Sequence, residues 1–269
     1  MATCITRRNM RTAERNWVGN PASHALHIAQ FMAIHEAEKA RKDMAKSQYG
    51  EWLWTDNRII DRCDEIVWQM TGEWKARRGS APVNRSRFWS SVVNGVRGAS
   101  IVLNEYGVSS LTDLGELNDS HYRTVLTKVE DSIREISAAK RTIRIHPVLG
   151  SKVLHHFFPS IVPVYDVEWI SRRVMRLDCA KGFAEGGGKD WVFRDYKNER
   201  NMREYHHYFA LCAQQICETD RSRVKYLRNR LGRSYSPLMP LAMVDSRKSI
   251  LWKLDAKLVE YCLVGATYG

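Results

Sequence analysis

The sequence lacks long apolar segments and the cysteine patterns of metal sites. No run of about eighteen apolar residues occurs, so no segment is expected to span a membrane. Residues 1–17 have no apolar stretch of signal-peptide type. The six cysteines show no C-x-x-C spacing, and His206, His207, Cys212 and Cys217 match no zinc motif. We therefore expect free thiols, no metal, no other cofactor and a cytoplasmic protein.

Acidic residues are in deficit. The chain has 42 Lys and Arg against 30 Asp and Glu, which gives a net charge of +12 at pH 7. Such an excess favours a polyanionic partner, with nucleic acid first and an anionic membrane surface second. A basic protein without such a partner stays open, because net charge alone says nothing about fold.

Alternation of apolar and polar residues, which is typical of strands, is absent at useful length. Apolar residues at three- and four-residue spacing instead predict helices over residues 21–48, 57–78, 87–107 and 245–265. A short and a long helix are predicted within residues 109–141, with N-terminal caps at Ser110 and at Asn118 or Asp119, and a further helix ends near Cys217. The predicted class is all-α, built from at least seven helices.

One stretch, HPVLGSKVLHHFFPSIVPVYD, combines a turn signal with an apolar helix. Residues 147–150 predict a tight turn, because glycine tolerates positive φ, and the helix would then begin at Ser151. The unpaired N–H groups of a helix start bind phosphate, and Arg144 and His146 add positive charge just upstream. The turn therefore predicts a clamp for one DNA phosphate.

The same stretch ends on an aspartate between rigid flanks. Pro159 is expected to end the helix, and Pro163 to keep the following residues extended, so that Asp166 begins the next helix. A carboxylate at that position caps a helix. A fixed carboxylate near DNA can also stabilise a sugar oxocarbenium ion or activate a water, as in the cleavage of glycosidic bonds.

These residues resemble the helix-hairpin-helix DNA glycosylase superfamily. The family signature is a Leu-Pro-Gly-Val-Gly-x-Lys hairpin, a core helix, Val-Pro-Val-Asp, and a helix with Arg-Val and Arg-Leu. The similar segments here are residues 148–152, 161–166 and 173–177, and upstream residues 88–95 and 110–114. The resemblance covers about residues 85–180, with one hairpin glycine instead of two and Tyr165 inserted before Asp166.

The resemblance implies a two-lobed helical bundle with a helix-hairpin-helix motif. Residues 1–84 would complete the first lobe, and residues 85–180 would form the glycosylase core. Residues 181–269, a Gly-rich loop and C-terminal helices, would return to the first lobe. The implied activity flips a modified base out of double-stranded DNA and cleaves its N-glycosidic bond, leaving an abasic site. We expect the enzyme to act as a monomer without a cofactor.

The resemblance also implies site residues. Asp166 is the catalytic carboxylate. Lys152 is either a nucleophile at the sugar C1′, as in members that also cut the strand, or a phosphate contact. The implied DNA-binding residues are Arg144, His146, Leu149, Gly150 and Ser151. The implied base-pocket residues are Trp89, Asn94, His155, His156, Glu168 and Trp169. Core packing of the tryptophans and histidines is the alternative, and one of the two adjacent histidines is expected to face the core.

The base itself is left open by the sequence. The leading expectation is resemblance to the phage-defence glycosylase that excises glucosylated hydroxymethylcytosine, ahead of base-excision repair of oxidised or alkylated bases. A non-catalytic helix-hairpin-helix DNA-binding module is the alternative from another class. A third reading, an RNA-processing or toxin-type protein, rests on net charge alone.

Overall fold

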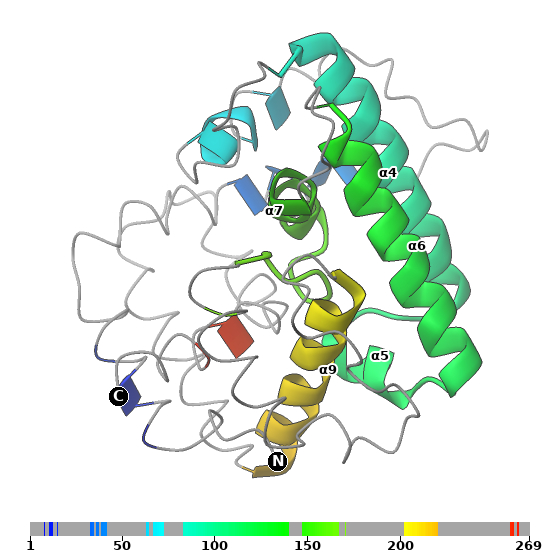
Figure 1. Ribbon diagram of the computed structural model, residues 1–269, viewed down its shortest axis with the longest axis vertical. Coiled ribbons are helices and arrows are strands. Elements are labelled where there is room, and N and C mark those ends of the chain that lie inside the picture. Colours follow the sequence, from blue (N-terminus) through cyan, green and yellow to red (C-terminus); the bar gives the residue numbers. More distant parts are fainter. Residues whose placement is uncertain are drawn as a thin grey trace.

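The protein is described by a computed structural model in which five helices have defined bounds (Figure 1). They are α4 (Arg85–Glu105), α5 (Leu111–Glu116), α6 (Asp119–Ser137), α7 (Pro147–Phe157) and α9 (Met202–Thr219). The structure describes residues 8, 11–12, 15, 33–34, 36–37, 39–41, 63–64, 67–72, 83–139, 147–166, 170, 202–219, 259–260 and 263. Among these residues there is no β-strand, so the predicted all-α class is confirmed for this part of the chain. No helix within it is long and apolar enough to cross a membrane.

The ends of α4 follow from local hydrogen bonds. The Asn84 side chain accepts from the N–H of Arg87 at the start of the helix. At the other end Gly107 has φ of +65°, and the N–H of Val108 donates to the carbonyl of Leu103, which is the Schellman pattern. The predicted helix over residues 87–107 is therefore confirmed to within two residues at each end.

The two predicted caps downstream are also confirmed. The Ser110 hydroxyl accepts from the N–H of Asp113 at the start of α5, and the Asn118 side chain accepts from the N–H of His121 at the start of α6. Each bond satisfies one of the N–H groups that a helix start leaves unpaired. The cap residue of α6 is Asn118 and not Asp119.

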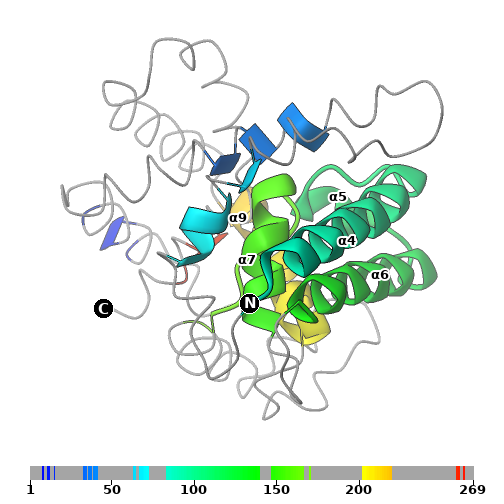
Figure 2. The same ribbon diagram turned by 90° about the horizontal axis from the view of Figure 1, so that it is seen from above.

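Helix α6 packs against three other described helices, α4, α7 and α9. Figures 1 and 2 show α4 and α6 side by side along one edge of the molecule. Two glycines allow the close approach. A Cβ at Gly95 of α4 would lie 2.6 Å from Ile136 Cγ1, and a Cβ at Gly150 of α7 would lie 2.0 Å from the carbonyl oxygen of Ile133. The backbones of α4 and α7 therefore both lie directly against α6.

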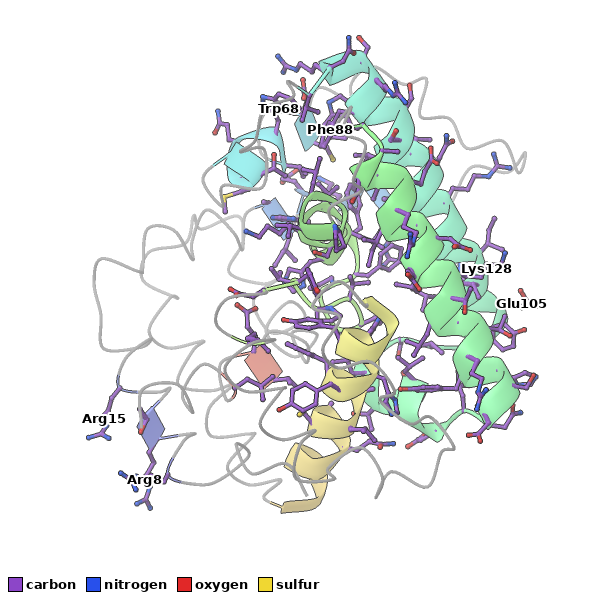
Figure 3. The ribbon with its side chains drawn as sticks, in the orientation of Figure 1. Arg8, Arg15, Trp68, Phe88, Glu105 and Lys128 are labelled. Carbon is purple, nitrogen blue, oxygen red and sulfur yellow. The ribbon has the colours of Figure 1, made fainter. Side chains whose placement is uncertain are left out.

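A short described segment that precedes α4 in the chain packs against one end of that helix. Residues 63–64 and 67–72, within the second predicted helix, are helical. The Trp89 indole N–H donates to Asp64 Oδ1 at 2.5 Å, and Arg85 forms an ion pair with the same carboxylate. Trp68 and Phe88 meet edge to face with ring centroids 5.1 Å apart, and Figure 3 labels both near the upper end of α4. These contacts make residues 63–64 and 67–72 part of the same core as α4.

The predicted tight turn at residues 147–150 is wrong. These residues are the first turn of α7, which begins at Pro147 and not at Ser151. Proline suits the first position of a helix, because its missing N–H would have no partner there. Gly150 is buried, and its N–H donates to Ser137 Oγ at 3.1 Å. The glycine therefore serves helix packing, since among the described glycines only Gly107 has a positive φ.

Candidate functional site

A buried segment without regular structure, residues 158–166, follows α7. Helix α7 ends at Phe157, next to Pro159, and residues 162–166 are not helical, as the two prolines predicted. Buried backbone groups outside helices and sheets need other partners, and each proline removes one N–H from that requirement. The carbonyl of Ser160 accepts from the N–H of Leu111, the first residue of α5.

Helix α7 supplies two further partners for this segment. The N–H of Tyr165 donates to Ser151 Oγ at 3.1 Å. The ring Nδ1–H of His155 donates to the carbonyl of Val162 at 2.7 Å. All four residues are buried, so water does not reach these polar groups and the two hydrogen bonds satisfy them. The segment is therefore held against the helix that precedes it.

Helix α9 supplies three more hydrogen bonds to the segment. The ring Nε2–H of His206 donates to the carbonyl of Ile161 at 2.7 Å. The Tyr205 hydroxyl donates to the carbonyl of Val164 at 2.9 Å and accepts from the N–H of Asp166 at 3.2 Å. A single buried hydroxyl thus bridges the two backbone groups on either side of Tyr165. These bonds fix the backbone where the segment ends at Asp166.

Asp166 lies half-buried at the end of the buried segment. Burial raises the pKa of the Tyr205 hydroxyl well above its ordinary value, and the negative charge of Asp166 raises it further. The charge of Glu260, from near the C-terminus, acts in the same direction. The hydroxyl therefore stays protonated and can donate at neutral pH, and two carboxylates lie within electrostatic range of it.

Lys152 is also half-buried, one residue after Ser151 in α7. Its carbonyl accepts from the ring Nδ1–H of His156 at 2.6 Å. The hydrogen bond between Tyr165 N–H and Ser151 Oγ joins the residues that immediately precede Asp166 and Lys152. The two predicted catalytic residues therefore each follow one member of the same hydrogen-bonded pair.

The three described residues of the predicted DNA clamp are buried. Leu149 and Ser151 are 1% and 0% exposed, and Gly150 is enclosed between α7 and α6. The Ser151 hydroxyl accepts from the N–H of Tyr165 and donates to the carbonyl of Val148. The expectation of an exposed clamp at these residues is therefore wrong, because they form the packed first turn of α7. Arg144, His146, Glu168 and Trp169 lie outside the described residues.

The expected division of His155 and His156 between core and pocket is wrong. Both side chains are fully buried. The His155 ring faces the buried segment, whereas the His156 ring bonds back to its own helix. Adjacent helical residues point about 100° apart, but α7 is covered on more than one side, so both directions lead into the core.

Trp89 and Asn94 have structural partners in α4. Trp89 is 5% exposed, and its indole N–H bonds to Asp64. The residue therefore packs in the core, as the alternative interpretation predicted. Asn94 is exposed and its Nδ2–H donates to Glu135 Oε1 of α6 at 3.3 Å. Asn94 therefore links the exposed faces of α4 and α6.

The outer α4–α6 face does not carry the positive charge of the chain. Residues 83–139 contain six Lys and Arg and seven Asp and Glu, which gives −1 against +12 for the whole chain. Figure 3 shows acidic Glu105 and basic Lys128 together on this outer edge. Polyanions are attracted by clustered positive charge, so this face is not where a polyanion is expected to bind.

The buried His206 makes stability depend on pH. Burial lowers the pKa of His206 to about 4, from about 6.5 in the unfolded chain. The unfolded state then binds the extra proton first as pH falls, so the stability present above pH 6.5 is lost progressively between about 6.5 and 4. We expect urea unfolding to show about 2 to 3 kcal/mol less stability at pH 4.5 than at 7.5 from this residue.

The control for this effect is a matched pair of variants. His206→Gln keeps an N–H donor for the carbonyl of Ile161 but does not titrate, so its stability should differ less between the two pH values. His121→Gln, at an exposed position on α6, should keep the wild-type difference. Equal pH dependence in wild type and His206→Gln would contradict the assignment.

Several residues of this site had no local signal in the sequence. Tyr205, His206 and Glu260 are separated from Asp166 by 39 or more positions, and nothing in their surroundings marks them as its neighbours. The sequence pattern of His206 and His207 relates only to a possible metal site. In the structure His206 bonds to the carbonyl of Ile161, and His207 bonds to the Tyr122 hydroxyl.

Comparison with known proteins found no matching family model, no matching curated protein and no matching solved structure.

Proposed function

We propose that the protein is a DNA glycosylase in which Asp166 is the catalytic carboxylate. The observation that carries the proposal is the position of Asp166, half-buried at the end of a buried segment whose backbone is bonded to α5, α7 and α9. A carboxylate held in this way needs little reorganisation before it acts on a developing positive charge. The sequence resemblance supplies the reaction class.

The chemistry follows from the charge that develops as the base departs. Cleavage of the N-glycosidic bond leaves positive charge on the sugar, which an ionised carboxylate stabilises. The same carboxylate can accept a proton from the water that attacks C1′. Lys152, which follows the serine that bonds to the residue before Asp166, can instead attack C1′ as the base departs and form a Schiff base if its pKa is depressed. Base excision is the proposed reaction, with strand cleavage as a variant of it.

The proposed DNA contact is made by the connection between α6 and α7. This connection takes the role that the sequence pattern gave to a turn at residues 147–150, and it still joins two consecutive helices. The connection includes Lys140, Arg141 and Arg144, and the chain outside residues 83–139 carries all of the net positive charge. In this proposal the flipped base enters a cleft between two lobes, the first completed by residues 1–84. Flipping costs a few kcal/mol, which stacking and hydrogen bonds in the pocket must offset.

The first experiment is a substrate panel. Duplexes that each carry one modified base, including glucosylated hydroxymethylcytosine, oxidised bases and alkylated bases, are incubated with the full chain and then treated with alkali. We expect strand breaks on one substrate class, with glucosylated hydroxymethylcytosine leading. Breaks before alkali treatment would assign strand cleavage to the enzyme and direct attention to Lys152.

Two results would replace the proposal. Tight binding to duplex DNA with no abasic site on any substrate would favour a non-catalytic DNA-binding module and leave Asp166 as a helix cap. Preferential binding or cleavage of RNA would favour the RNA-processing alternative.

A further inference from the structure

We infer that Tyr205 is the positioning residue for Asp166. Its hydroxyl bonds directly to the backbone of Asp166. It lies on α9, 39 residues away in the chain, so the bond is made only when α9 packs against the buried segment. The catalytic consequence rests on the proposed function, whereas the geometric role does not.

The geometry distinguishes Tyr205 from an ordinary core tyrosine. The hydroxyl uses its proton for the carbonyl of Val164 and a lone pair for the N–H of Asp166, so it spans the peptide groups around Tyr165. Its ring packs edge to face against Tyr165 and stacks on Phe209, with ring centroids 4.8 Å apart in both pairs. These contacts hold the ring in the core, and with it the hydroxyl that bonds to the backbone of Asp166.

The other bonds to the segment are made to residues that precede Asp166. His206 bonds to residue 161, His155 to residue 162, and Ser151 to residue 165. Loss of one of these would leave the Tyr205 bridge in place. Loss of the bridge itself would leave the N–H of Asp166 and the carbonyl of Val164 to move, and with them the carboxylate.

The test compares Tyr205→Phe with Tyr122→Phe in the full chain. Both variants remove one buried tyrosine hydroxyl, and that of Tyr122 bonds to His207 and not to the segment. Hydrogen–deuterium exchange of the peptide covering residues 158–166 is measured for each. We expect exchange at least about tenfold faster in Tyr205→Phe and unchanged in Tyr122→Phe. An amide that loses its hydrogen bond exchanges through local openings of the backbone that cost less free energy. Equal protection in wild type and Tyr205→Phe would overturn the inference.

The kinetic arm uses the substrate identified by the panel. Tyr205→Phe should lower kcat by about 10 to 100-fold with KM nearly unchanged, because a displaced catalytic group costs rate and not binding. In an Asp166→Asn background the same substitution should cause no further loss, since it acts through Asp166. A full additional loss there, or an unchanged kcat in Tyr205→Phe, would make the residue merely structural. Inactivity of the wild type on every duplex would reject the proposed function, while the exchange result would still decide the positioning role.

Discussion

Asp166→Asn should lower the rate of abasic-site formation by at least about 100-fold on the substrate that the wild type cleaves. The amide has nearly the shape of the carboxylate but no negative charge, so it can neither stabilise the sugar cation nor accept a proton from water. The N–H of residue 166 can still donate to Tyr205, so the fold should be retained. Rates are measured under single turnover from alkali-induced strand breaks, and DNA affinity from titration.

A second aspartate provides the control. Asp131 is exposed on α6, and Asp131→Asn makes the same change in charge away from the site. It should cleave at the wild-type rate. DNA affinity should be equal or higher in Asp166→Asn, because a negative charge near the phosphates has been removed. A wild-type rate in Asp166→Asn would remove the carboxylate from the mechanism and return it to a capping role.

Gly150→Ala should destabilise the protein by about 2 to 4 kcal/mol. In an open helix this substitution is favourable by about 0.5 to 1 kcal/mol, because alanine has less conformational freedom to lose. Here the new Cβ would lie 2.0 Å from the backbone oxygen of Ile133 and 2.6 Å from Ser137 Oγ. Helix α7 would have to move away from α6, and the hydrogen bond from Gly150 N–H to Ser137 Oγ would be lost with it. Urea unfolding monitored by tryptophan fluorescence measures the change.

Gly98→Ala is the matched comparison. Gly98 is helical and exposed in α4, and the nearest atom to its new Cβ would be the Ser132 hydroxyl oxygen at 3.0 Å. A hydroxyl can rotate, whereas the backbone carbonyl of Ile133 cannot, so the change in stability should stay within about 1 kcal/mol. Equal stability of Gly150→Ala and wild type would contradict the close packing of α7 against α6.

Helix positions were predictable where the signal is local. Asn118 and Ser110 cap their helices through side-chain bonds that span three residues, and Gly107 ends α4 through its own backbone angle. Apolar spacing located α6 and the end of α9 within a few residues, because one face of each is buried. These features depend on neighbours in the sequence and need no knowledge of the rest of the fold.

The same residue types misled where the deciding contact is distant. Gly150 after Pro147 reads as a turn, but α6 approaches so closely that glycine is needed inside a helix. The sequence predicts Ser151 as an exposed helix start, but its buried hydroxyl accepts a hydrogen bond from the N–H of Tyr165. In both cases a local preference of about 1 kcal/mol was outweighed by packing in the core.

The amino-acid sequence by itself therefore determined the helical class, the ends of α4, the caps of α5 and α6, the positive charge and the rigid flanks of Asp166, since each follows from composition or from residues a few positions apart. Only the tertiary structure decided that α7 begins at Pro147, that His155 and His156 are both buried, and that Tyr205 and His206 hold the segment before Asp166. The reason is physical: buried backbone groups take whichever partners the packed fold brings within reach, and those partners come from distant parts of the chain.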